Sequence, residues 1–68
     1  MPASISVVLP RTEQTELFVH DLIGRRVRTL QRGSLAAGLH QFEWNGRDDS
    51  GRRVPAGVYF VTLDGPGE

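Results

Sequence analysis

A chain of 68 residues can form one small domain, and a domain of this size buries only about 60% of the surface that its unfolded chain exposes. Eight basic residues, all arginine, balance eight acidic residues, and this zero net charge argues against a protein whose main task is to neutralise nucleic-acid phosphates or an anionic membrane. The sequence contains no cysteine and two histidines, so it has no disulfide framework and does not indicate a structural zinc site.

Short runs of β-branched, leucine and aromatic residues are separated along the chain by clusters of glycine, proline, asparagine and aspartate. The clusters recur about every 8 to 12 residues, which is typical of a β-sandwich or barrel. In the first run, Ile5, Val7 and Leu9 alternate with their neighbours until Pro10 ends the pattern. The first three runs are residues 4–9, 15–20 and 26–30.

The fourth run, residues 40–44, shows the clearest alternation. His40, Phe42 and Trp44 share one face, as expected for a half-buried strand whose aromatic face points to the core. A polar loop follows, and the near-continuous apolar run 58–63 completes the set.

Helical and membrane-spanning elements are not expected. A short apolar stripe over residues 13–22 has no cap, and the glycines elsewhere recur too regularly for helices of typical length. No apolar stretch approaches the roughly 18 residues of a membrane span. We also find no internal repeat.

Three segments together resemble one family. They are residues 21–30 (DLIGRRVRTL), residues 37–48 with AGLH and WNGRD at their two ends, and residues 51–60 (GRRVPAGVYF). Their order and spacing resemble the immunoglobulin-like domain of the flagellar hook-capping protein FlgD, which is related to the C-terminal sorting modules of type IX secretion. The resemblance covers residues 5–63. It implies a small antiparallel immunoglobulin-like or fibronectin III-like β-sandwich with an accessory role.

The resemblance also implies that the last strand is absent. In members that serve as sorting signals, a further basic and apolar strand follows the Val-Tyr-Phe strand, whereas this sequence stops at Glu68. A sheet edge left without its neighbour exposes unpaired backbone groups that recruit strands from other molecules. We therefore expect that the chain can form a homo-oligomer through this edge.

We predict a single module over residues 1–68, with six or seven strands in an ordered core of about 4–63 and a turn or frayed tail over 64–68. Its expected function is that of a non-catalytic accessory module of a larger bacterial secreted or envelope-associated protein, acting in structural support, assembly, or sorting and attachment. The expected partners are the other domains of that protein. The expected location is extracytoplasmic, with the export signal outside this fragment, because the N-terminus has neither a basic flank nor a cleavage site.

The candidate core combines the aliphatic residues of the predicted strands with the large aromatics. Trp44 is expected at its centre, and the Tyr59 hydroxyl is expected to anchor a strand corner. The alternative is that Trp44, Tyr59 or Phe60 forms an exposed flat surface, which would indicate a carbohydrate-binding module. The predicted core residues are Leu17, Val19, Val27, Leu30, Phe42, Trp44, Val58, Tyr59 and Phe60. The predicted turn residues are Asp21, Gly24, Gly38, Gly46, Gly51 and Gly57.

The turn at residues 21–24 allows two interpretations. Leu22 and Ile23 are apolar residues in a turn, which would suit a recognition loop. The pattern favours a structural role, in which Asp21 bonds to the turn backbone, Gly24 adopts positive φ, and one of the two apolar residues plugs the end of the sandwich.

The polar loop after Trp44 contains oxygen-bearing residues that a calcium site would need. Asn45, Asp48 and Asp49 are the candidate ligands, but calcium takes six to eight oxygens and no acidic residue follows at EF-hand spacing. A hairpin loop with Asx turns fits the sequence better.

Arginines cluster at residues 25–32 and 52–53. A nucleic-acid-binding β-barrel would place them beside aromatic residues, but solvated strands paired with acidic residues agree better with the zero net charge. Catalysis is not indicated, because His20 and His40 stand outside any ligand spacing and no nucleophile motif or carboxylate pair accompanies them. We expect no cofactor.

Overall fold

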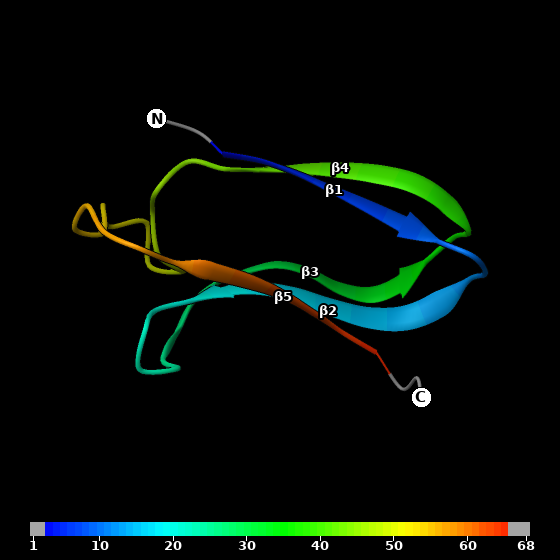
Figure 1. Cartoon of the computed structure of the whole chain (residues 1–68), viewed down its shortest axis with the longest axis horizontal. Helices are drawn as coiled ribbons and strands as arrows, with labels where there is room; N and C mark the ends of the chain where they lie inside the picture. The colour runs from blue at the N-terminus through cyan, green and yellow to red at the C-terminus, as the bar shows by residue number, and fades with distance from the viewer. Residues whose placement is uncertain (1–2, 66–68) are drawn as a thin grey trace.

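The computed structural model describes residues 3–65, which form two antiparallel sheets packed as layers (Figure 1). One sheet pairs β1 with β4, and the other has the order β3-β2-β5. The predicted all-β antiparallel sandwich is confirmed. Within the described residues, no helix could cross a membrane. The strands are β1 (Ala3–Leu9), β2 (Glu13–His20), β3 (Arg26–Leu35), β4 (Gly38–Trp44) and β5 (Phe60–Asp64).

The two-stranded sheet follows the alternation of its sequence. Ile5 lies opposite Phe42, and Val7 lies opposite His40. Residues opposite each other in an antiparallel pair share a face, so the alternating apolar residues of β1 and the aromatic residues of β4 line the same inner surface. On the outer surface, Val8 and Leu39 form a pair that is exposed to solvent.

The centre of the other sheet is β2, which pairs with β3 on one side and with β5 on the other. β3 is longer than the predicted run 26–30, because backbone pairing with β2 continues through the polar residues 31–35. The register shifts twice along this pair, and Val27 and Leu30 are the residues skipped. Such bulges bend the strand and increase its twist.

The core is small and lies between the two layers. Leu17 and Val19 of β2 are the side chains with almost no exposure, at 1% and 0%. Leu17 forms one apolar cluster with Val7 and Leu9, two buried residues of β1 that the predicted core omits. Trp44 is buried as expected. The predicted core residues Val27, Leu30, Phe42 and Tyr59 are half-buried.

Two predicted core residues are wrong. Val58 is 60% exposed, because it lies in the loop before β5, and Phe60 is 48% exposed. Phe60 lies opposite His20 on the outer face of β2, whereas Val61 lies opposite the buried Val19. The inward-facing residues of β5 are therefore the odd-numbered ones, and the uninterrupted apolar run gave no alternation from which to choose the face.

The inner face of β5 is only partly covered. Val61 and Leu63 share the face of Val19 and Leu17, yet they are 42% and 40% exposed. Asp64 belongs to β5, so the predicted tail begins later than residue 64, and residues 66–68 lie outside the described residues.

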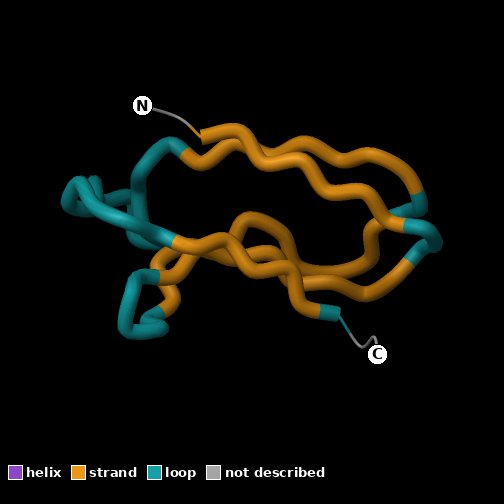
Figure 2. Tube along the Cα trace, in the orientation of Figure 1, coloured by secondary structure: helices purple, strands orange, loops and turns teal. Residues whose placement is uncertain are grey.

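The loops gather at the two ends of the sandwich (Figure 2). The turn between β2 and β3 and the long loop between β4 and β5 lie at the end where β1 begins, and β5 finishes near the opposite end (Figure 1). Instead of the six or seven predicted strands, the described residues contain five. The long loop contains only an isolated bridge between Arg47 and Arg53.

We expect Leu17→Ala to lower the free energy of unfolding by about 2 to 5 kcal/mol, because it leaves a cavity in a core with few other buried side chains. Leu39→Ala makes the same chemical change on the exposed outer face and should shift stability by less than about 0.5 kcal/mol. Urea denaturation followed by Trp44 fluorescence measures both. Equal losses from the two variants would show that Leu17 does not lie at the centre of the core.

Candidate functional site at the end with the two aspartate turns

The segments 21–25 and 45–59, which are far apart in the sequence, meet at one end of the sandwich (Figure 2). They line an open cleft of about 460 Å³ together with Arg26 and Val27 at the start of β3. All three segments that carry the family resemblance therefore contribute to this end, and it is the candidate functional site.

The turn between β2 and β3 is held by Asp21. Its Oδ1 accepts hydrogen bonds from the backbone N–H groups of Ile23 and Arg25, at 3.1 and 2.9 Å. Its Oδ2 accepts one from Arg25 Nε at 3.0 Å. The Asp21 carbonyl accepts from the Gly24 N–H, and Gly24 has a φ of 89°. Asp21 thus bonds to the turn backbone and Gly24 has positive φ, as predicted.

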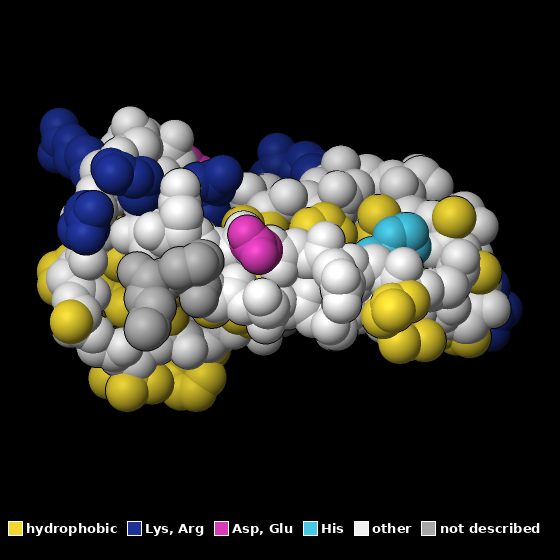
Figure 3. All heavy atoms as spheres, turned by 90° about the horizontal axis from the view of Figure 1, so that it is seen from above, with side chains coloured by type: hydrophobic (Ala, Val, Ile, Leu, Met, Phe, Trp, Pro, Cys, Tyr) yellow, Lys and Arg dark blue, Asp and Glu magenta, His cyan; other side chains and the backbone are white. Residues whose placement is uncertain are grey.

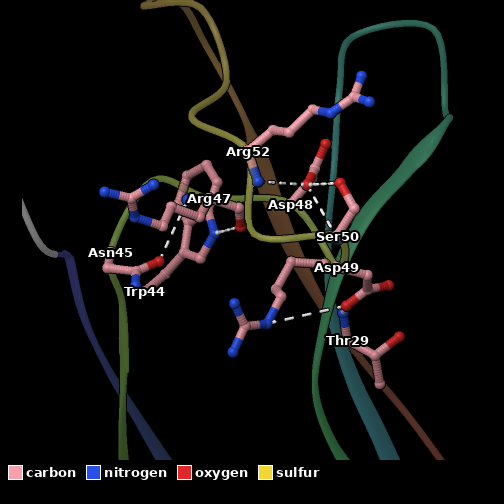
Figure 4. A network of polar contacts seen from close by, with 9 residues as sticks. Thr29, Trp44, Asn45, Arg47, Asp48, Asp49, Ser50 and Arg52 are labelled. Carbon is pink, nitrogen blue, oxygen red and sulfur yellow. Dashed lines mark hydrogen bonds and ion pairs between the residues drawn. The ribbon is translucent and has the colours of Figure 1, made fainter.

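The long loop contains a second turn of the same design, centred on Asp48 (Figure 4). Asp48 Oδ1 accepts from the backbone N–H groups of Ser50 and Arg52, at 3.0 and 2.9 Å. The Asp48 carbonyl accepts from the Gly51 N–H, and the φ of Gly51 is also 89°. In both turns the aspartate N–H donates to the carbonyl of the arginine four residues later.

The shared geometry reflects a short repeat that the sequence analysis missed. Residues 21–26 read D-L-I-G-R-R, and residues 48–53 read D-D-S-G-R-R. Aspartate supplies the side-chain acceptor and glycine the positive φ, so these two residue types at this spacing specify the turn. The prediction of no internal repeat is therefore wrong for this six-residue pattern.

The two turns differ in their central residues. Asp49 docks on the free edge of β3: its N–H donates to the Val27 carbonyl, and its Oδ1 accepts from the Thr29 N–H, both at 3.0 Å (Figure 4). In the first turn, Leu22 and Ile23 are 69% and 76% exposed. The prediction that one of them plugs the sandwich end is wrong, because the turn directs both away from the core.

The aspartates that hold these turns stay ionised in the folded protein. Partial desolvation acts to raise the pKa of the Asp21 carboxyl, but the hydrogen bonds from Arg25 and Ile23 outweigh it and the pKa is lowered. For Asp48, the hydrogen bond from the Ser50 hydroxyl is the largest cause of a lowered pKa, followed by the Arg52 N–H. In both turns the ionised carboxylate accepts hydrogen bonds from backbone N–H groups.

Two aromatic residues connect the long loop to the sandwich. Trp44 Nε1 donates to the Arg47 carbonyl at 2.8 Å, and the Trp44 ring meets Tyr59 edge-on with ring centres 5.2 Å apart. The Tyr59 hydroxyl donates to the Pro55 carbonyl, as expected for a corner anchor. Because Trp44 is buried and bonded in this way, it offers no flat surface to a sugar.

The candidate calcium ligands do not converge. Asn45 Oδ1 accepts from the Arg47 N–H, and the oxygens of Asp48 and Asp49 are used by the backbone contacts of the loop. Asx turns, the alternative that the sequence favoured, account for Asn45 and Asp48, whereas Asp49 bonds to the β3 backbone. Within residues 3–65, no three His, Cys, Asp or Glu side chains are grouped as metal ligands would be.

The outer face of the three-stranded sheet carries the paired arginines. Glu16 accepts from Arg26 at 2.9 Å and from Arg32 at 2.7 Å, and the Arg32 hydrogen bond is the main cause of its lowered pKa. Arg26 also lies 3.8 Å above the centre of the Phe18 ring. Arg26 and Arg32 thus pair with an acidic residue of their own sheet, as the sequence favoured. These two arginines do not form the row of unpaired basic side chains that the nucleic-acid-binding alternative would require.

The histidines have structural contacts. His20 packs between Phe18 and Phe60, with ring centres 5.8 and 5.6 Å away, and its Nε2 lies 2.9 Å from Thr62 Oγ1. His40 Nε2 lies 2.7 Å from the Ala36 carbonyl. Packing and hydrogen bonding explain the positions of both rings.

These features define the class of protein: a small immunoglobulin-like β-sandwich whose polar side chains organise turns at one end. The family model of the FlgD Ig-like domain matches residues 1–66. The chain belongs to the FlgD Ig-like domain family.

The chain is similar to three curated proteins, each called basal-body rod modification protein FlgD. It is 44% identical to those of Salmonella typhimurium and Salmonella typhi over 62 residues, which are 91% of this chain and 26% of each relative. It is 40% identical to that of Escherichia coli K12 over 45 residues, or 66% of this chain and 20% of the relative. The chain thus spans about a quarter of the length of the curated relatives it matches.

We expect Gly24→Ala and Gly51→Ala each to lower the free energy of unfolding by about 1 to 2 kcal/mol, because both glycines have positive φ and an added Cβ would be strained there. Gly57→Ala is the matched control. An added Cβ meets nothing within 4 Å at any of these three positions, but φ at Gly57 is not positive. Thermal and urea unfolding measure the effect, and a loss at Gly57 equal to the other two would contradict the assigned role of backbone conformation.

Proposed function

We propose that this chain is a non-catalytic structural module of a larger exported bacterial protein that acts in building the flagellar rod and hook. The observation that carries this proposal is its membership of the FlgD Ig-like family, with relatives named basal-body rod modification proteins. The structural-support and assembly functions are favoured over sorting or attachment, because none of the matched relatives is named as a sorting protein. An extracytoplasmic location follows from the same proposal.

The architecture suits a module placed in line between other parts of a protein. The body is 35 Å long, and the described chain starts toward its loop end and finishes toward the opposite end (Figure 1). The polar side chains at the loop end hydrogen-bond to the turn backbone and fix the conformation of the loops. A sandwich with loops fixed in this way supports the proposed function as a spacer and assembly element, with the other domains of the parent protein as its first partners.

A chimera tests this function. In a Salmonella typhimurium strain that lacks its own FlgD, we would express FlgD with its matched 62-residue segment replaced by this chain. We expect swimming in soft agar to be restored, because the fold and the loop end would be kept. A flexible Gly-Ser linker of equal length should fail to restore it. A chimera that is folded and exported but does not swim, or a linker that works equally well, would contradict the proposal.

We further propose that β5 pairs edge to edge with a second copy of the chain. Among the described residues, β5 pairs with β2 on one side, and no described strand pairs with its other side. Its inner-facing residues Val61 and Leu63 keep two fifths of their surface exposed, which an added strand would cover. Both features are typical of an edge that accepts a strand.

Sedimentation equilibrium over a wide concentration range tests the edge. We expect the wild-type chain to form a dimer, and Leu63→Lys to be monomeric because it places a charge on the inner face of the edge strand. Leu39→Lys, on the outer face of β4, should leave the dimer unchanged. A wild-type chain that stays monomeric, or a Leu63→Lys variant that still dimerises, would overturn edge pairing.

A further inference from the structure

Asn45 and Gly46 follow β4 directly, and Asn45 is the only asparagine of the sequence. The Asn45 side chain is exposed, and the space beside Gly46 is open, because an added Cβ there would meet nothing within 4 Å. Asn45 Oδ1 accepts a hydrogen bond from the Arg47 N–H at 3.2 Å (Figure 4). The proposed function assigns no task to this pair of residues, so its own chemistry can be considered.

The reactive group of such a pair is the backbone nitrogen that follows the asparagine. Once it has lost its proton, the Gly46 nitrogen is a nucleophile held in the same short segment as Asn45 Cγ, so the two reacting atoms need no encounter. Glycine has no side chain to shield this nitrogen, and its backbone adopts a wide range of conformations. Within residues 3–65, the Gly46 N–H donates no hydrogen bond, and its proton is therefore open to a base from solvent.

The Asx turn assists attack on the side-chain amide. When a nitrogen adds to Asn45 Cγ, negative charge develops on Oδ1. The Arg47 N–H already points at this oxygen from 3.2 Å, and a donor placed in advance stabilises such a charge. The turn thus combines a free nucleophile with a donor at the oxygen of the group that it attacks.

We propose that Asn45–Gly46 is a site of spontaneous deamidation in the folded protein, with hydroxide and water as the reactants. Hydroxide removes the Gly46 amide proton, and the nitrogen forms a bond to Asn45 Cγ. The bond from Cγ to Nδ2 then breaks, and the departing nitrogen takes protons from water and leaves as ammonia. Water opens the resulting succinimide ring. Attack on Cγ gives aspartate, whereas attack on the main-chain carbonyl of residue 45 gives isoaspartate, in which the chain continues through Cγ.

The isoaspartate product lengthens the backbone by a methylene group just after Trp44. Trp44 Nε1 donates to the Arg47 carbonyl at 2.8 Å, and the Val54 N–H donates to the Gly46 carbonyl at 2.9 Å. Arg47 also forms the isolated bridge with Arg53. An added atom in the chain moves these donors and acceptors out of register, so isoaspartate releases the start of the long loop. Aspartate keeps the normal backbone and the Oδ1 acceptor, so it leaves the loop in place.

Peptide mapping by mass spectrometry of the intact chain, aged at neutral and at alkaline pH, tests the site. We expect both products at residue 45, formed at a rate proportional to the hydroxide concentration. N45S is the matched control, because its hydroxyl can accept the same N–H but offers no carbonyl to attack. Asp64–Gly65 can also form isoaspartate, but it releases no ammonia, so the mass gain distinguishes the two sites.

A destabilised variant shows whether the folded state reacts. The stability loss expected above for Leu17→Ala raises the unfolded population by about thirtyfold or more. We expect L17A to deamidate at the rate of the wild type. A rate that rises with the unfolded population, an absence of conversion in the wild-type chain, or conversion in N45S would overturn the proposed site.

Limited trypsin digestion measures release of the loop. In the view from above, arginine side chains gather at the loop end (Figure 3), and Arg47, Arg52 and Arg53 of the long loop are exposed. We expect the isoaspartate form to be cut in this loop more than about tenfold faster than the fresh chain, because cleavage follows local opening. Freshly purified N45D should be cut at the rate of the fresh wild type. An isoaspartate form that is cut as slowly as N45D would overturn loop release, and none of these readouts depends on the proposed function.

Discussion

The hydrogen bonds from backbone N–H groups to the Asp21 and Asp48 carboxylates are the interactions on which the loop end of this small sandwich depends. Among residues 3–65, two side chains are almost fully buried, and burying one such side chain contributes only about 1.5 to 3 kcal/mol. A connection as long as residues 45–59 would be costly to order on packing alone. The Asp48 turn fixes the middle of this connection, and Asp49 then attaches it to the edge of β3.

The same interactions position the aromatic anchor. The Trp44 indole donates to the Arg47 carbonyl immediately before the Asp48 turn, and Tyr59 packs on Trp44 at the far end of the loop. The long loop therefore contacts the sandwich near its start through Arg47, in its middle through Asp49 and at its end through Tyr59. A protected β3 edge is one consequence, since the backbone groups of Val27 and Thr29 that face away from β2 bond to Asp49 instead of remaining open to another strand.

The strands and their inward faces could be predicted from the sequence where apolar residues alternate with other residues, and not elsewhere. In β1 and β4 the apolar residues occur at every second position, so both the strands and the inward faces could be predicted. In residues 58–63 every position but one is apolar or aromatic, so the inward face had to come from the register with β2. The extent of β3 and its two bulges likewise arise from pairing with β2, which no local pattern encodes.

The candidate site shows the same division. The bonding of Asp21 and the conformation of Gly24 follow from turn chemistry, and the matching sequence at residues 48–53 could have revealed the second turn. Whether Leu22 plugs the sandwich or leaves it depends on the direction of the turn relative to the sheets, which only the assembled fold determines. In both turns a carboxylate oxygen accepts backbone N–H groups, and Asp49 Oδ1 accepts the Thr29 N–H, so these acidic groups act first as turn and loop anchors. The hydrogen bonds that stabilise the loop end therefore occupy oxygens that a metal site at this end would need as ligands.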